Sequence, residues 1–340
     1  MVMIFIFEIP SGAIADYLGR KTALTLSAVY IIFAAFTYSI IPNIILFFLA
    51  ETLWALGGAL FSGTDEAFLY STLKTTDQED TLPKILGRTN TMFLLANVIS
   101  APLGSIIAEF VSLQFTMNCL GLIYIGTFIT SLTFKEPVFE KKAKKNYFKI
   151  LKEGFKELKQ NKILRILCFD RLFINILIFL LFWTYQPYLV AINVPILTLG
   201  FILAAMNVVN AIFNELIPKF FKRVKSKKLL LVIIDVIAGI AFILMGFTTY
   251  PLYSIILLLF IVGFGYPRGL LYINGINKQI ESENRATVIS TINMFRSISN
   301  AILYPFIGLI VEWNIFALFI IVGTLILIFT ALTRVKSEYL

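Results

Sequence analysis

The chain has 340 residues, of which 59% are hydrophobic and only 14% are charged, and its formal net charge is +9. A typical soluble domain carries about 25% charged residues, and a soluble protein this apolar would expose large apolar patches and aggregate. The composition therefore excludes a soluble globular protein and predicts an all-α polytopic membrane protein. The sequence contains no histidine, which excludes His-ligated metals and Ser-His or Cys-His catalysis. We expect no cofactor and no metal.

Apolar runs long enough to cross a bilayer recur along the whole sequence. About 20 apolar residues span the hydrocarbon core as a helix, and these runs lack the alternation of barrel strands. Residues 1–15 do not have the pattern of a signal peptide, because no basic segment precedes them and Glu8 interrupts the apolar run. We predict that they form a shortened span. We predict ten further, full spans, at residues 22–41, 43–66, 88–110, 113–134, 163–187, 195–218, 229–249, 251–274, 286–311 and 313–333.

The distribution of lysine and arginine among the loops predicts the orientation of the chain. All but three of the 29 Lys and Arg residues lie in one set of alternate loops, and the other set carries none. Cytoplasmic loops carry an excess of these residues, so we expect the basic loops and the C-terminus to be cytoplasmic. This arrangement accounts for the positive net charge without nucleic acid. We expect a multi-pass protein of the plasma membrane.

The longest loop, residues 135–162, is rich in lysine and divides the spans into two lobes. The N-terminal lobe, residues 1–134, holds five spans, and the C-terminal lobe, residues 163–340, holds six. Within the loop, residues 147–159 predict an amphipathic helix with apolar residues on one face. Such a helix would lie on the anionic inner leaflet, and a solvated basic linker is the alternative.

The turn between the first two predicted spans carries a short motif, made of Gly12, Asp16, Gly19, Arg20 and Lys21. Gly12 would let helices approach closely, Gly19 would allow a tight turn, and the charged residues could make charge-assisted contacts. This pattern resembles the loop signature of the major facilitator superfamily. Residues 62–67 with Tyr70, and residues 285–290, look like a bacterial subgroup of that family.

The resemblance implies a bundle of two lobes in which the loop signature latches the halves on the cytoplasmic side. Asp65 would pair with Arg20 across the helix ends and contribute to gating. In the family the signature follows the second of twelve helices, so the resemblance implies that the first helix is missing and about eleven remain. The fourth helix of the family often carries an arginine tied to proton coupling, whereas this sequence has Glu51 and no arginine there.

Polar and charged side chains inside the spans are the candidates for substrate binding and ion coupling. A charge at the bilayer centre costs roughly 2.5–3.5 kcal/mol on insertion scales and persists when it is paired or faces a wet cavity. Structural ion pairing is the alternative for each residue, and for Arg268 we favour that alternative. The candidates are Glu8, Glu51, Asp170, Arg171, Gln186, Arg268, Asn293 and Arg296.

The sequence thus predicts a secondary transporter that moves a small solute by alternating access, coupled to an ion that by analogy is a proton. Efflux is one candidate direction, although the departures from the family's motifs do not support proton-driven drug efflux. The alternative is a membrane protein that does not transport, such as a sensor, a scaffold or a truncated, degenerate transporter. An enzyme is not expected, because the sequence contains no nucleophile–base set and no Walker motif. The expected partners are a small molecule and the lipid bilayer, and we expect a monomer.

Overall fold

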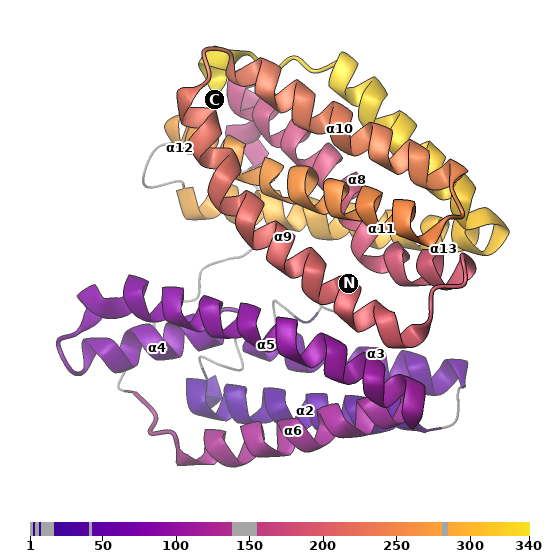
Figure 1. Cartoon of the computed structure of the whole chain (residues 1–340). Helices are drawn as coiled ribbons and strands as arrows, with labels where there is room; N and C mark the ends of the chain where they lie inside the picture. Colours follow the sequence, from indigo (N-terminus) through magenta and orange to yellow (C-terminus); the bar gives the residue numbers. More distant parts are fainter. Residues whose placement is uncertain (1–2, 4–6, 8–16, 41–42, 138–154, 281–284) are drawn as a thin grey trace. The chain divides into compact units, whose positions relative to one another are not determined.

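The computed structural model describes residues 3, 7, 17–40, 43–137, 155–280 and 285–340, and the described residues form helices and no strand. The contacts divide the chain into two compact units, Met1–Lys145 and Asn146–Leu340. The boundary lies within residues 135–162. The two units are coloured from indigo to yellow along the chain in Figure 1, and each is described below by itself.

The N-terminal unit is built around α2 (Arg20–Ser39). This helix packs against α3 (Ile44–Phe61) and α6 (Leu113–Thr133). The approach is close because glycines face α2: a Cβ on Gly57 of α3 would lie 2.6 Å from Cγ1 of Ile31. The unit also contains α4 (Thr64–Lys74), a 3-10 turn (Glu79–Thr81) and α5 (Leu82–Phe110).

The predicted span at residues 43–66 is divided between α3 and α4. The two helices form one apolar segment, Ile44–Lys74, but Gly63 breaks it with a φ of 75°. Glycine adopts this left-handed conformation without the steric cost that other residues bear. The break turns the chain just before Asp65 and Glu66, which lie in the first turn of α4.

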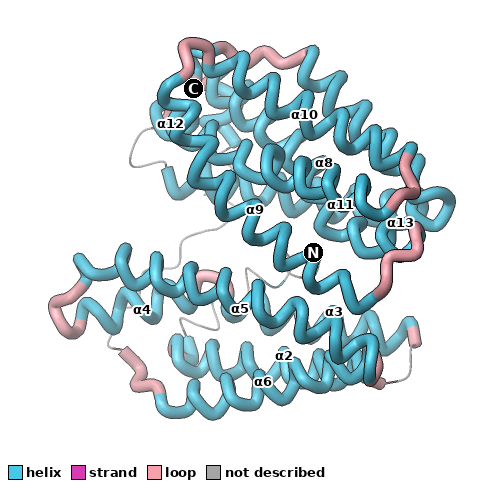
Figure 2. Tube along the Cα trace, in the orientation of Figure 1, coloured by secondary structure: helices cyan, strands magenta, loops and turns pink. Residues whose placement is uncertain are grey.

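The C-terminal unit begins with three long helices, α8 (Lys162–Ala191), α9 (Ile196–Arg223) and α10 (Lys227–Phe247). Figure 2 shows that short loops connect the successive helices. The helix α8 carries many of the buried residues and contacts α9, α11, α12 and α13. The elements that follow α10 are α11 (Pro251–Phe260), a π turn (Ile261–Gly265), a 3-10 helix (Tyr266–Tyr272), α12 (Ile273–Lys278), α13 (Arg285–Ala331) and a 3-10 turn (Ser337–Tyr339).

The long helix α13 contains the last two predicted spans. Asn314 interrupts it with a non-helical backbone (φ −164°, ψ 106°). The Asn314 side chain accepts hydrogen bonds from the N–H groups of Phe316 (2.9 Å) and Ala317 (3.1 Å), and so caps the second half. That half packs closely on α10, where a Cβ on Gly323 would lie 2.5 Å from the carbonyl oxygen of Gly239.

Within the described residues, nine helical segments are long and apolar enough to cross a membrane. The last of them, Met294–Ala331, contains the break at Asn314 and covers two predicted spans, so the full spans match the sequence prediction. The predicted span at residues 1–15 lies outside the described residues except for Met3 and Phe7. Of the predicted amphipathic helix, residues 147–154 are also outside, and residues 155–160 are helical.

Candidate functional site

A buried ion cluster joins three elements of the C-terminal unit. Nη2 of Arg268 lies 2.5 Å from Oδ1 of Asp170 on α8, and Nε of Arg268 lies 2.5 Å from Oδ1 of Asp235 on α10. Arg268 is 0% exposed and Asp235 is 2% exposed. A charge buried this deeply requires a partner, and here one guanidinium serves two carboxylates.

Neutral groups complete the cluster on the side of Asp170. The hydroxyl of Tyr272 donates to Oδ1 of Asp170 at 2.5 Å, and the hydroxyl of Thr333 donates to the other oxygen, Oδ2. Asp170 therefore accepts hydrogen bonds from three side chains, whereas the described contacts of Asp235 come from Arg268 alone. With both acids ionised, the cluster carries one excess negative charge.

An irregular backbone places Arg268 at this position. The span Pro251–Lys278 changes from α-helix to a π turn and then to a 3-10 helix, and π-type bulges are frequent at functional sites. Two glycines let this stretch lie against α8: a Cβ on Gly265 would meet Ile178 at 2.8 Å, and a Cβ on Gly269 would meet Nδ2 of Asn175 at 2.8 Å.

A second polar site, which we call the arginine hollow, lies beside the cluster in the same unit. It consists of two adjoining cavities of about 400 and 240 Å³ that share Arg171, Asn175 and Arg296 in their walls. Arg171 lies about 14 Å along α8 from Lys162, and Arg296 lies about 16 Å along α13 from Arg285. Asn210, Asn214 and Tyr266 also line the larger cavity.

Several polar groups of the arginine hollow have no partner among the described residues. Arg171 and Arg296 make no ion pair or hydrogen bond with any described residue, and their like charges repel each other. Oδ1 of Asn175 and the hydroxyl of Tyr266 are buried without a hydrogen-bond partner among the described residues. Leaving such a group unsatisfied costs about 1–3 kcal/mol, so the hollow is arranged to receive polar groups from elsewhere.

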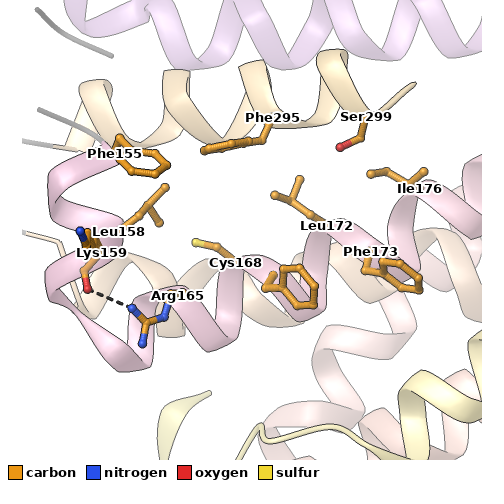
Figure 3. A pocket seen from close by; sticks show the side chains of 11 residues that line it. Phe155, Leu158, Lys159, Arg165, Cys168, Leu172, Phe173, Ile176, Phe295 and Ser299 are labelled. Atoms are coloured by element: carbon orange, nitrogen blue, oxygen red, sulfur yellow. Dashed lines mark hydrogen bonds between the residues drawn. The ribbon is translucent and has the colours of Figure 1, made fainter. Parts of the chain in front are cut away.

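A third cavity, of about 520 Å³, is mainly apolar (Figure 3). It lies between residues 155–159, α8 and the first half of α13. Nη1 of Arg165 donates to the carbonyl oxygen of Lys159 at 3.0 Å, as drawn in Figure 3. Apolar walls offer few groups to orient a polar solute, so the arginine hollow is the better candidate. The apolar wall consists of Phe155, Leu158, Cys168, Phe169, Leu172, Phe173, Ile176 and Phe295.

The N-terminal unit contains a cavity of its own and one of the predicted acids inside a span. Glu51 is exposed and accepts a hydrogen bond from the hydroxyl of Tyr38 at 2.5 Å, which joins α2 and α3. The cavity, of about 500 Å³, is lined mainly by α2, α3, α4 and α6 and includes Asp65. These two acids are thus in different surroundings within the unit.

The described part of the loop motif makes a compact set of contacts at the start of α2. Gly19 has a φ of 97°, and the N–H groups of Arg20 and Lys21 donate to the two carboxylate oxygens of Glu136 at 2.7 and 2.8 Å. Nη1 of Arg20 donates to the carbonyl oxygen of Ala67 at 2.5 Å, on the helix that also bears Asp65. A carboxylate at a helix N-terminus is stabilising, and Glu136 is a residue that the sequence reasoning missed.

The other sequence candidates are not gathered at these sites. Gln186 is exposed and donates to the hydroxyl of its neighbour Tyr185 at 2.8 Å, about 22 Å along α8 from Arg171. Glu8, Gly12 and Asp16 lie outside the described residues, and so does the side chain of Asn293. The structure therefore brings together Asp170 with Arg268, and Arg171 with Arg296. It adds Asp235, Asn175 and Tyr266, of which only Asp235 stands out in the sequence, as an acid within an apolar run.

Comparison of the fold with solved structures finds transporters. A nucleoside transporter, NupG, matches with a TM-score of 0.76 and 16% identity over 98% of this chain and 88% of that chain. The peptide transporter POT matches with a TM-score of 0.73 and 12% identity, covering 97% of this chain and 82% of that chain. A D-xylose–proton symporter matches with a TM-score of 0.69 and 11% identity, covering 100% and 86%.

At these identities the similarity establishes the fold alone, an all-α polytopic membrane fold. No curated protein matches the sequence. The family model of the Major Facilitator Superfamily matches residues 1–302. Together these findings support an integral, multi-pass membrane transporter for a small molecule, and they point away from an enzyme. The resemblance seen in the loop motif is confirmed: the chain belongs to the Major Facilitator Superfamily.

Proposed function

We propose that this protein is a secondary active transporter of the plasma membrane, which moves a small solute by alternating access and is driven by protons. The lobes at residues 1–134 and 163–340 would rock about the solute, with the linker at residues 135–162, the basic loops and the C-terminus in the cytoplasm. The proposal of proton coupling rests on the buried cluster, in which Asp170 and Asp235 share one cation, Arg268.

The physical argument concerns the excess charge of this cluster. An unbalanced charge deep within a span is costly, and the uptake of one proton by one carboxylate removes it. Hydrogen bonds to a carboxylate favour its ionised form. Asp170 accepts three of them from side chains and Asp235 accepts one. We therefore assign the proton to Asp235, the acid with fewer hydrogen bonds.

Proton binding drives transport only if the two access states differ in their affinity for the proton. A cluster enclosed by α8, α10 and the irregular stretch of Pro251–Lys278 is suited to this task, because a small shift of one element alters the distance between charges in a region of low dielectric. Two of these elements, α8 and the irregular stretch, also form walls of the arginine hollow, so the occupancy of the hollow and the protonation of the cluster would influence one another.

The test uses the protein reconstituted into vesicles, with a panel of radiolabelled solutes (an organic acid, a sugar, a nucleoside and a dipeptide) assayed with and without an imposed pH gradient. We expect the gradient to raise the accumulation of at least one solute. Asp235→Asn should still exchange that solute, but its gradient-driven accumulation should be at least tenfold lower than that of the wild type. The control is Glu215→Gln, because Glu215 is an exposed acid paired with Lys219 at 2.6 Å.

Two results would overturn the proposal. Accumulation that is equal with and without the gradient, in the wild type, would remove proton coupling. An Asp235→Asn variant that accumulates solute like the wild type would remove the cluster from the coupling step. Absence of transport in every arm would instead support the alternative of a membrane sensor or scaffold.

A further inference from the structure

Among the residues that the structure describes, the two cations of the arginine hollow have no counter-ion, and this imbalance identifies a ligand class. We infer that the hollow binds the anionic group, a carboxylate or a phosphate, of the transported solute. Arg171 and Arg296 would bind that group together, one from α8 and one from α13. The claim that this solute is transported rests on the proposed function, whereas anion binding itself does not require it.

The contrast between the arginines of this unit supports a ligand over a structural role. Arg268 has two carboxylates at 2.5 Å, which is the arrangement expected of an arginine kept for packing or coupling. Arg171 is on the same helix as Asp170, its immediate neighbour, yet it makes no ion pair with a described residue. Ionisable residues within membrane spans are costly and mark pathways for ions or substrates, and the repulsion between two like charges that line the same cavities increases the cost.

The geometry of the hollow suits an anion that has further polar groups. Guanidinium groups present paired N–H donors that match the oxygens of a carboxylate or phosphate. Asn175 lies one turn from Arg171, and its Oδ1 is buried and without a described partner, so it can accept a hydrogen bond from a hydroxyl or amine of the solute. The hydroxyl of Tyr266 likewise has no hydrogen-bond partner among the described residues, and Tyr266 lines the same cavity.

The size of the hollow limits the solute. The larger cavity, of about 400 Å³, is near the lower end of the range of about 300–1,000 Å³ found for small-molecule pockets. Asn210 and Asn214 on α9 already bond to each other at 3.1 Å, which leaves the two arginines as the dominant recognition groups. The ligand class is therefore a metabolite-sized organic anion, as distinct from a large apolar drug.

The test measures binding directly, in purified protein in detergent without any ion gradient. Thermal unfolding is followed with matched pairs of an anion and its uncharged counterpart: lactate and lactamide, succinate and succinamide, glycerol phosphate and glycerol, at equal ionic strength. A ligand that binds the folded state raises the unfolding temperature in a saturable manner. The variants are Arg171→Gln and Arg296→Gln, and the control is Arg223→Gln, an exposed arginine at the end of α9.

We expect at least one anion, and not its uncharged counterpart, to stabilise the wild type and the control. Its affinity should fall at least tenfold in each of the two hollow variants, and Arg171→Lys should recover part of the affinity because the charge remains. The pair that responds distinguishes a carboxylate from a phosphate. The inference is overturned by equal stabilisation from the uncharged counterparts, by unchanged anion affinity in both hollow variants, or by a panel in which no anion binds.

This experiment separates the failure of the inference from the failure of the proposed function. Anion binding that depends on both arginines, in a protein that accumulates nothing under a pH gradient, would leave the inference standing and refute the transport proposal. Gradient-driven accumulation of an uncharged solute, with no anion binding, would do the opposite.

Discussion

Replacement of Arg268 by glutamine tests the buried cluster most directly. The substitution removes the only guanidinium that contacts Asp170 and Asp235 among the described residues, together with its two contacts at 2.5 Å. Breaking a buried ion pair by removal of one partner costs about 3–5 kcal/mol, because a charge is left uncompensated. Here two carboxylates are left, so we expect Arg268→Gln to lower the free energy of unfolding by an amount at the upper end of that range.

The loss can be measured by denaturant-induced unfolding in mixed micelles, followed by circular dichroism at 222 nm. The double variant Arg268→Gln/Asp235→Asn should recover about 1–2 kcal/mol, since contacting residues couple by this amount. Acidic buffer should recover a similar part, since protonation neutralises the remaining carboxylates. The exposed Arg223→Gln should change stability by less than about 0.5 kcal/mol. Equal stabilities of Arg268→Gln and Arg223→Gln would refute the reasoning.

Three further substitutions test contacts outside the cluster, each measured by thermal unfolding in detergent. Glu136→Gln should cost about 0.5–1 kcal/mol, because it removes the charge that caps two N–H groups at the start of α2. An unchanged midpoint in low salt would contradict this. Tyr188→Phe should cost about 1–3 kcal/mol, because the lost hydroxyl contacts the carbonyl oxygen of Met245 (2.8 Å) and Oγ of Ser254 (2.9 Å). An unchanged midpoint in Tyr188→Phe would show that the carbonyl group of Met245 and the hydroxyl of Ser254 bond to water instead. Gly323→Leu should prevent the close packing of α13 on α10 and lower the unfolding temperature. Gly308→Leu is the control, because a Cβ on Gly308 would meet no atom within 4 Å, and equal unfolding temperatures of the two variants would contradict the prediction.

The fold was accessible from sequence because it depends on one strong signal, the length of the apolar runs. The bilayer fixes that length, so the spans could be placed without knowledge of their packing. The break at Gly63 and the irregular stretch around Arg268 were not predicted, because a long apolar run looks the same whether its helix is regular or not. The pairing of helices likewise depends on small residues such as Gly239, whose partner in space the sequence does not reveal.

The site was only partly accessible for a related reason. Charges inside spans are conspicuous, so the sequence alone marks Asp170, Arg171, Arg268 and Arg296 as candidates. Which of them pair could not be read from the sequence, because the choice depends on the rotation of α8, which directs adjacent residues to different surroundings. Uncharged groups such as Asn175 and Tyr266 became candidates only when their buried atoms proved to lack partners.

The two polar sites are coupled by their charges, since Asp170 and Arg171 are neighbours on α8. The described charges of both sites, Arg171, Arg268 and Arg296 with Asp170 and Asp235, sum to +1 when both acids are ionised. A solute with one negative charge brings this sum to zero, and a dianion does so once Asp235 has bound a proton. Moving one elementary charge through the membrane potential changes the energy by about 2.3 kcal/mol per 100 mV.

The charge balance therefore predicts different responses to voltage for two modes of transport. When both acids are ionised, exchange of a monoanion, in which only the loaded, neutral site reorients, should not depend on membrane potential. Net uptake also returns the empty, positive site, and should change with potential when valinomycin and potassium set the voltage of the vesicles. Arg296→Gln makes the empty site neutral and the loaded site negative, so exchange should become dependent on voltage while net uptake remains so. Exchange and net uptake that respond equally to voltage in the wild type would show that these five charges do not govern reorientation.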